Sequence, residues 1–167
     1  MDYTGDPVLD HLATLGVEHE VMACDPDLAD TALFCEAYGI DPDDSANAIL
    51  VAGKADPRPY ALCLVLATCR LDVNGVVRKR LGTRKASFAG ADETARLTGM
   101  LIGGVTPFGL PSRVPTWVDS RVMERTNVVI GGGSRDRKIR LAPAGLLVLP
   151  GAEVVEDLGR SAPPPEG

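Results

Sequence analysis

The sequence predicts an α+β domain. Short apolar runs of strand length recur along the chain, and segments of helical pattern interrupt them at irregular places. Aromatic residues make up only 4% of the 167 residues, so the core must be built from Val, Leu, Ile and Ala. This length fits one domain with a sizeable core. We expect that domain to cover residues 1–158, followed by a disordered tail with three consecutive prolines over residues 159–167.

Three Asp-Pro pairs in the first fifty residues mark helix starts, because proline fits the first turn and acidic residues favour the N-terminal end of a helix. Asp6-Pro7 predicts a helix that Gly16 ends, and Asp25-Pro26 predicts a helix that Gly39 ends. The third pair predicts a single helical turn over residues 41–44. Between the two helices, residues 17–22 alternate as a strand does.

The middle of the chain predicts a β-hairpin. Residues 46–52 and 60–67 are apolar runs, and residues 53–59 between them have the Gly, Asp and Pro composition of a turn. Beyond the hairpin the pattern predicts shorter elements. These are a basic helix over 73–81, a strand over 85–88, a helix over 91–97, strands over 114–118, 127–130 and 139–141, and a strand or a turn of helix over 145–149.

Charge is distributed unevenly along the chain. Residues 1–53 contain twelve Asp or Glu and no Lys or Arg, so this segment carries −12, whereas residues 54–140 contain sixteen Lys or Arg and seven Asp or Glu and carry +9. A basic face can bind a phosphate backbone even when the whole chain, at −6, is acidic. The alternative is that the two segments interleave in the fold and neutralise each other.

The cysteines and the N-terminus indicate the compartment. The four cysteines, at positions 24, 35, 63 and 69, form no CxxC pair, so metal-site spacing is absent and we expect small buried hydrophobic side chains in a reducing compartment. Residues 1–7 lack the basic region that begins a secretory signal. The sequence also has no run of about 18 apolar residues, which a membrane-spanning helix would need. We therefore expect a cytoplasmic protein with no membrane partner, no metal and no cofactor.

The densest motif is LTGMLIGGVTPFG, residues 97–109. Glycines let a ligand approach the backbone closely and leave amides free to point at an anion. The triple glycine at residues 131–133 belongs neither to a serine-hydrolase motif nor to a P-loop. Ser134 after it is not in a G-x-S-x-G arrangement, and no Gly-Lys-Ser/Thr follows as a P-loop requires.

This motif resembles the signature of the YbaK/EbsC family, in which a serine stands at the position of Thr106. The likeness covers roughly residues 8–150 and rests on the order of several motifs. These are Leu71–Asn74, Arg84–Ala89, Val118-Asp119, Gly131–Gly133 and Lys138–Leu141.

The resemblance implies a mixed, partly closed, barrel-like sheet with helices packed around it. It implies a trans-editing hydrolase that deacylates mischarged aminoacyl-tRNA, with tRNA as partner and an aminoacyl-tRNA synthetase as a possible second partner. Amides of the glycine motif would stabilise the oxyanion of ester hydrolysis. The implied catalytic residues are Gly103, Gly104 and Asn47. The implied substrate-binding residues are Thr106, Pro107, Gly109, Asp119 and Gly132.

One residue departs from the family pattern. Asn47 opens the strand at which the family usually carries a lysine, so the hydrogen-bonding capacity remains while the charge is lost. Two hypotheses follow, a deacylase with altered affinity or substrate, and a non-catalytic module that binds an aminoacyl or nucleotide end. Given the family, the basic residues Arg78, Lys79, Arg80 and Lys85 are candidates for RNA contact, although such runs are also typical of a solvated face.

Overall fold

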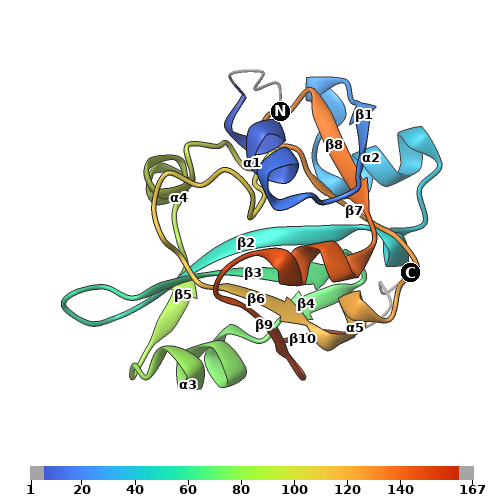
Figure 1. Cartoon of the computed structure of the whole chain (residues 1–167). Coiled ribbons are helices and arrows are strands. Elements are labelled where there is room, and N and C mark those ends of the chain that lie inside the picture. Colours follow the sequence, from blue (N-terminus) through green and yellow to red (C-terminus); the bar gives the residue numbers. More distant parts are fainter. Residues whose placement is uncertain (1–5, 162–167) are drawn as a thin grey trace.

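The computed structural model describes residues 6–161, which form three β-sheets with short helices around them (Figure 1). The strands are β1 (Glu20–Ala23), β2 (Ala46–Gly53), β3 (Tyr60–Leu66), β4 (Cys69–Leu71), β5 (Ala86–Phe88), β6 (Thr116–Asp119), β7 (Val128–Gly131), β8 (Arg137–Leu141), β9 (Ala152–Val155) and β10 (Gly159–Ser161). The α-helices are α1 (Pro7–Leu15), α2 (Thr31–Tyr38), α3 (Arg78–Leu81), α4 (Ala91–Thr98) and α5 (Ser120–Met123). Short segments of 3-10 or π helix are η1 (Pro26–Leu28), η2 (Pro42–Asp44), η3 (Val73–Val77) and η4 (Pro143–Val148).

The predicted hairpin is the centre of a five-stranded mixed sheet. β2 and β3 pair antiparallel from Ala46–Leu66 to Ala52–Tyr60. β6 and β9 continue the sheet beyond β3 in parallel, and β5 pairs antiparallel with the end of β2 nearest the turn. The order is therefore β5-β2-β3-β6-β9, with the hairpin turn projecting to one side (Figure 1).

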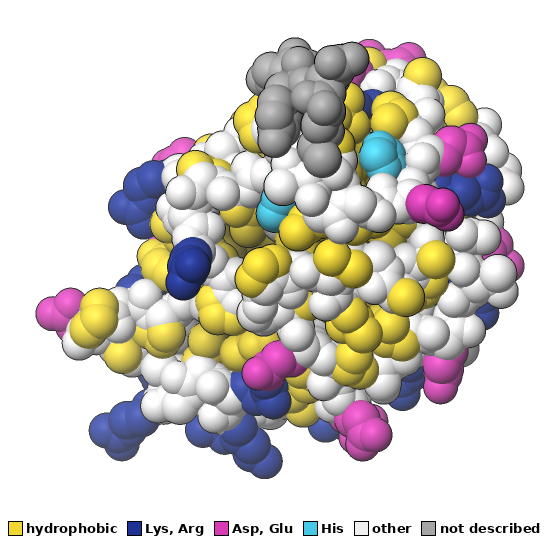
Figure 2. Space-filling view, in the orientation of Figure 1, with side chains coloured by type: hydrophobic (Ala, Val, Ile, Leu, Met, Phe, Trp, Pro, Cys, Tyr) yellow, Lys and Arg dark blue, Asp and Glu magenta, His cyan; other side chains and the backbone are white. Residues whose placement is uncertain are grey.

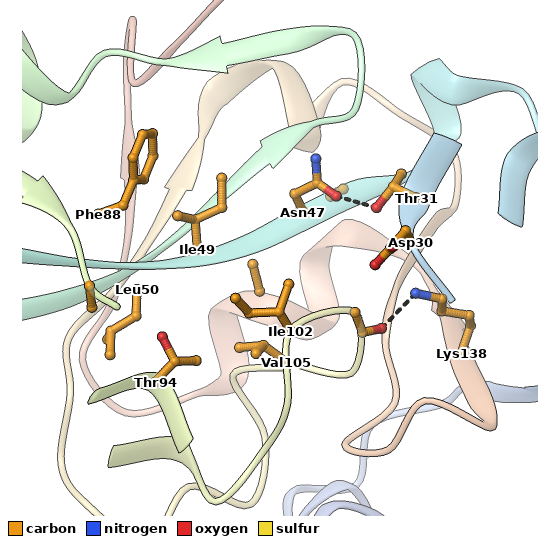
Figure 3. A pocket seen from close by; sticks show the side chains of 14 residues that line it. Asp30, Thr31, Asn47, Ile49, Leu50, Phe88, Thr94, Ile102, Val105 and Lys138 are labelled. Carbon is orange, nitrogen blue, oxygen red and sulfur yellow. Dashed lines mark hydrogen bonds between the residues drawn. The ribbon is translucent and has the colours of Figure 1, made fainter. Parts of the chain in front are cut away.

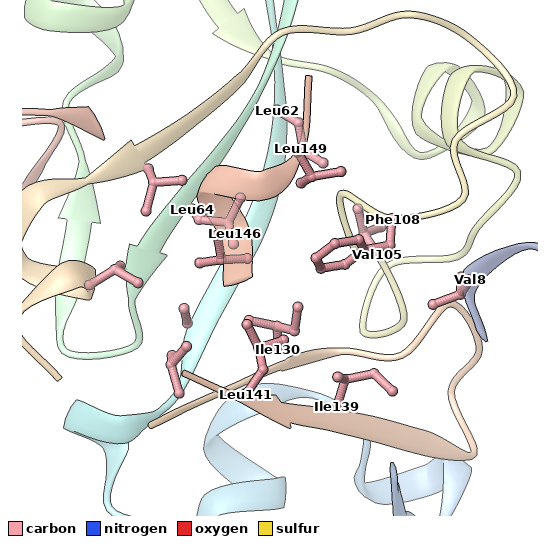
Figure 4. Packing of buried hydrophobic residues seen from close by; sticks show 14 of the residues in the cluster. Val8, Leu62, Leu64, Val105, Phe108, Ile130, Ile139, Leu141, Leu146 and Leu149 are labelled. Atoms are coloured by element: carbon pink, nitrogen blue, oxygen red, sulfur yellow. The ribbon is translucent and has the colours of Figure 1, made fainter. Parts of the chain in front are cut away.

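The uninterrupted apolar run of β3 follows from burial on both of its faces. Leu62 and Leu64 join the main core cluster, whereas Cys63 and Val65 face a second cluster beneath the sheet. A strand covered on both sides shows a continuous apolar run instead of the alternation of a half-exposed strand. The main cluster fills the space between this sheet and the three-stranded sheet, which contributes Ile130 (Figure 4).

The three-stranded sheet, in the order β1-β8-β7, is antiparallel throughout. α2 packs against it through Phe34 and Cys35, which cluster with Val129 of β7. Cys24, Cys35 and Cys63 are buried as predicted, while Cys69 is only partly buried, and all four are free thiols.

The α+β class is confirmed, but the barrel is not. Within residues 6–161 the strands form separate sheets of five, three and two strands, and no sheet closes on itself. The expected start of the tail at residue 159 is also too early, because Gly159–Ser161 form β10, which pairs with β4. Residues 162–167 of that tail lie outside the described residues.

Other elements differ from the sequence prediction in their bounds. The basic helix over residues 73–81 starts with the π turn η3 and is α-helical only over α3. Residues 145–149 fall mostly in η4, so of the two alternatives helix is correct. No helix within residues 6–161 has the length and apolar character needed to cross a membrane.

Candidate functional site

A pocket of about 440 Å³ opens between β2, the start of α2 and the glycine loop, which we define as residues 99–109 (Figure 3). One half is apolar, formed by side chains of β2, β5 and the glycine loop. The other half carries the polar side chains Asp30, Thr31, Asn47 and Lys138. The complete lining is Asp30, Thr31, Ala46, Asn47, Ala48, Ile49, Leu50, Phe88, Ala89, Thr94, Ile102, Gly103, Val105 and Lys138.

The pocket lies along an open edge of β2. β3 pairs with β2 over its whole length, whereas β5 pairs only with residues 51–53. The carbonyl of Leu50 points to the β5 side, where it accepts a hydrogen bond from Ala89 N–H at 2.9 Å. Because successive residues of an antiparallel strand direct their peptide groups to opposite edges, the N–H and C=O of Ala48 point to this same open side. Main-chain donors and acceptors therefore face the pocket.

Asn47 lies in the polar half of the pocket, at the start of β2. Its side-chain oxygen accepts a hydrogen bond from the hydroxyl of Thr31, the first residue of α2 (Figure 3). The amide NH₂ group of Asn47 has no acceptor among residues 6–161. The Thr31 bond therefore fixes the side chain and leaves two donors for a ligand.

Lys138 of β8 is the cation of the pocket, although the sequence placed it only in the family motif Lys138–Leu141 and not among the site residues. Its side chain is buried, with the residue 5% exposed, and Nζ donates to Gly103 O at 2.8 Å and to Ala29 O at 2.6 Å. The Phe34 ring lies 5.4 Å from Nζ. Burial lowers the pKa of Lys138 below the usual lysine value.

The glycine loop keeps its shape through positions that admit no side chain. Gly104 N–H donates to Leu101 O at 2.9 Å, which closes a turn whose third residue, Gly103, has φ +93°. A positive φ at the third residue of a turn requires glycine or a similarly permissive residue. A Cβ on Gly131 would lie 2.1 Å from Val105 O, so the loop packs backbone to backbone on β7.

Gly103 is thus placed in the pocket lining, and Gly104 is not. Gly104 accepts a hydrogen bond from Gly133 N–H at 2.7 Å, and its own N–H is already used within the turn. By contrast, the N–H groups of Gly103 and Val105 have no acceptor in the described part of the chain, and both residues line the pocket. The loop residues that line the pocket, Ile102, Gly103 and Val105, therefore all have N–H groups without an acceptor within residues 6–161.

A family model of the aminoacyl-tRNA editing domain matches residues 25–149, which hold both walls of this pocket. The chain belongs to this family. The resemblance to YbaK/EbsC proteins is therefore confirmed.

Related editing domains share both sequence and fold with this chain. A proposed Cys-tRNA(Pro)/Cys-tRNA(Cys) deacylase, EbsC of Enterococcus faecalis, is 26% identical over 122 residues, which are 72% of each protein. The crystal structure of a proposed trans-editing enzyme for prolyl-tRNA synthetase matches with a TM-score of 0.78 and 25% identity, covering 93% of this chain and 97% of the other. The hypothetical protein APE2540 has the same fold, with a TM-score of 0.81 at 22% identity, covering 93% and 100% of the two chains.

Four other predicted site residues of this editing domain lie outside the pocket lining. Thr106 is buried, and its hydroxyl oxygen has no hydrogen-bond partner among the described residues. Pro107 lines a second hollow of about 690 Å³. Gly109 donates to Nδ1 of His11 at 2.8 Å, and Gly132 accepts from Arg137 Nε at 2.7 Å. The last two contacts hold the glycine loop and the β7–β8 turn in place.

Asp119 also lies away from the pocket. Its carboxylate is fully buried at the end of β6, 3.7 Å from the Arg121 guanidinium, and a Cβ on Gly159 of β10 would come within 2.7 Å of it. Burial raises the pKa of Asp119. This position joins β6 to β10 and does not reach the pocket.

The predicted RNA-binding residues of the editing domain differ in whether their side chains are already bound to other residues. Figure 2 shows Lys and Arg side chains gathered at the end of the molecule where α3 lies. Arg80 is committed to an ion pair with Glu153 and lies 4.9 Å from the centre of the Trp117 ring. Lys79 and Lys85 are exposed and form no ion pair within residues 6–161.

Arg78 is also bound locally, because its Nε donates to Asn74 O at 2.9 Å.

No three His, Cys, Asp or Glu side chains of the described chain come together as a metal site would require.

Proposed function

We propose that the protein is an aminoacyl-tRNA deacylase, which hydrolyses the ester between a wrong amino acid and the 3′ end of a tRNA. The observation that carries the proposal is the pocket itself. In a chain of the editing family, the family's glycine loop and the strand that starts near Asn47 meet at one cavity. A buried cation and unpaired main-chain amides lie in its lining.

The chemistry needs water and an oxyanion site. A water oxygen attacks the ester carbonyl carbon, the carbonyl oxygen takes on negative charge, and the bond to the ribose oxygen then breaks. The proton released by the water ends on that ribose oxygen, so the products are a free amino acid and a free ribose hydroxyl. The N–H groups of Gly103 and Val105 suit the developing oxyanion, because preorganised donors stabilise it without reorganisation.

The apolar half of the pocket suits the uncharged parts of the ligand. Ile49, Leu50 and Val105 offer an apolar wall to an amino-acid side chain. Phe88 and Ile102 lie on the rim, and both are more than half exposed. An exposed aromatic ring at a rim is suited to stacking on a nucleobase. The open edge at Ala48 adds main-chain hydrogen bonding for a polar group of the ligand.

The second candidate is a module that binds an aminoacyl or nucleotide end without cleaving it. Asn47 at the position of the family lysine favours this function. The two candidates predict the same ligand and differ in the fate of the ester bond.

A deacylation assay separates them. Purified protein is incubated with tRNA charged with each of the standard amino acids in turn, and ester loss is compared with loss in buffer. A deacylase accelerates loss for at least one mischarged tRNA. A binding module accelerates none, yet it binds an aminoacyl-adenosine analogue whose ester is replaced by an amide. A protein that does neither contradicts both candidates.

A further inference from the structure

Lys138 is a buried cation without an acidic partner. No carboxylate of residues 6–161 lies within 4.0 Å of its ammonium group. Asp30, which shares the pocket, is instead paired with Arg135 at 3.2 Å and keeps 61% of its side chain exposed. Buried charges are costly and are normally paired, so a lysine retained in this position needs a reason.

The hydrogen bonds of Lys138 leave one donor unused. An ammonium group has three N–H donors, and two of them bond to the carbonyl oxygens of Gly103 and Ala29. The third has no acceptor in the part of the chain that the structure describes. Because Lys138 lines the pocket, a bound ligand can supply this acceptor in place of water.

The two occupied donors also fix the direction of the third. They tie β8 to the glycine loop on one side and to the segment before α2 on the other. Arg135 reinforces the same junction, since it bonds to both Asp30 and the carbonyl of Ile102. The ammonium group is therefore held in place before a ligand arrives, which is the condition for strong electrostatic stabilisation.

We propose that Lys138 is a catalytic residue whose third N–H binds a negatively charged oxygen of the ester substrate, so that β8 supplies the charge that β2 lacks at Asn47. This inference rests on the proposed function. The oxygen has two possible sources, the oxyanion that forms at the ester carbonyl and a phosphate of the terminal nucleotide.

The geometry explains how β8 can supply a positive charge that β2 does not carry. Asn47 and Lys138 lie on different sheets, yet both line the polar half of one pocket, with Asp30 and Thr31 between them (Figure 3). A cation placed from either strand enters the same cavity.

The test replaces Lys138 by Met, which keeps an unbranched side chain and removes the charge and the donors, and by Gln, which keeps a neutral donor. Lys54→Met is the matched control, because Lys54 is exposed and does not line the pocket. We expect kcat/KM for ester cleavage to fall on the order of 10²–10³-fold in Lys138→Met, less in Lys138→Gln, and to stay at the wild-type value in Lys54→Met.

Kinetic constants distinguish the two sources of the oxygen. A fall in kcat at constant KM indicates the oxyanion. A rise in KM, with weaker binding of an amide analogue that carries the terminal phosphate and unchanged binding of one that lacks it, indicates the phosphate.

A double variant separates charge from loop support. Asn47→Lys in the Lys138→Met background restores the cation without restoring the bond to Gly103, so at least tenfold recovery of kcat/KM is expected if the charge is what matters. No recovery would make Lys138 a support of the loop and overturn the proposal. So would Lys138→Met activity within about twofold of the wild type at an unchanged melting temperature.

The proposed function and the Lys138 inference can fail separately. If the wild type binds the amide analogue that carries the terminal phosphate but cleaves no ester, hydrolysis is wrong, and Lys138 is then judged by that affinity. A loss of at least tenfold in Lys138→Met supports the charge role, and no loss overturns it. If the wild type neither binds nor cleaves, both proposals fall.

Discussion

Asn47 and Thr31 form the contact that fixes the polar half of the pocket. Asn47→Ala removes the hydrogen bond and the two free donors while leaving Lys138 in place. Losing one neutral hydrogen bond costs about 0.5–1.5 kcal/mol, so we expect kcat/KM to fall about threefold to tenfold. The control is Asn127→Ala, which changes an exposed asparagine outside this pocket and should leave the deacylation rate unaltered. Equal rates for Asn47→Ala and the wild type would remove Asn47 from the site.

At the same scale, Gly131 of β7 acts through close packing against the glycine loop. Gly131→Ala would place a Cβ 2.1 Å from Val105 O, which is backbone and cannot move aside. Overpacking of this kind costs about 1–3 kcal/mol, and we expect that loss in the free energy of unfolding measured with urea. Gly90→Ala, where a Cβ meets nothing within 4 Å, should cost less than about 1 kcal/mol. A Gly131→Ala protein as stable as Gly90→Ala would contradict the close approach.

This packing also corrects the expected role of Gly104. A Cβ there would lie 2.9 Å from the backbone of Ser134, so a larger side chain at 104 disturbs the fold together with the pocket. Loss of activity in such a variant does not report on access to the site alone.

At the scale of single residues, two of the predicted site positions have a local sequence signal and also line the pocket. Gly103 belongs to a dense motif and Asn47 to a strand start, and the structure brings both to the pocket. Lys138 lies in the motif Lys138–Leu141, but its burial in the pocket depends on contacts with residues 35 and 109 positions away, which no local pattern encodes. Asp119 and Thr106 were nominated by the family pattern, and their burial elsewhere reflects packing that no single motif encodes.

At the scale of elements, α4 is tied to the start of β3 by one carboxylate. Glu93 accepts a hydrogen bond from the Tyr60 hydroxyl at 2.6 Å and pairs with Arg58 at 3.2 Å. The Tyr60 bond is the main contribution that holds the pKa of Glu93 below its usual 4.5. Since the folded pKa lies below the unfolded one, this contribution to stability is full above about pH 4.5 and is lost as the pH falls through the lowered value.

The corresponding prediction uses Tyr60→Phe. Removing the hydroxyl should reduce the free energy of unfolding by about 1 kcal/mol at neutral pH, with a smaller loss at a pH below the lowered pKa of Glu93. Urea titrations across this acid range measure the difference. A Tyr60→Phe penalty that does not shrink in acid would show that the hydroxyl and the charge of Glu93 are not coupled.

Elements were predictable when their apolar runs were long or their turns were marked. The β2–β3 hairpin has both, with apolar runs of seven and eight residues around a Pro-rich and Gly-containing turn. β4, β9 and β10 were missed, because strands of three or four residues with several exposed side chains show no clear alternation. They form only because an edge of a sheet or another short strand is available to pair with them.

Over the whole molecule, the acidic and basic segments of the sequence partly neutralise each other. Ion pairs join Asp6 to Arg137, Asp30 to Arg135 and Asp44 to Arg125, each linking residues 1–53 to residues 54–140. The alternative of interleaved segments therefore holds for these pairs. The exposed Lys79 and Lys85, in and near α3, form no ion pair within residues 6–161. They remain the candidate surface for binding a tRNA backbone.

Salt dependence tests this surface. Lys79 and Lys85 are exposed, so the double variant Lys79→Ala, Lys85→Ala should weaken tRNA binding and reduce the slope of log affinity against log salt by about 1 for each lost phosphate contact. Arg80→Ala should change the slope less, since Arg80 is already paired with Glu153. An unchanged slope in the double variant would place the RNA on another face.

The central claim is that the pocket between β2 and the glycine loop receives the aminoacyl end of a tRNA. A crystal structure with an aminoacyl-adenosine analogue, in which an amide replaces the scissile ester, tests it most directly. We predict that the carbonyl oxygen of the analogue lies within hydrogen-bonding distance of the N–H of Gly103 or Val105, with Asn47 and Lys138 around the ligand. An analogue found in the second hollow, beside His11 and Pro107, would contradict the account.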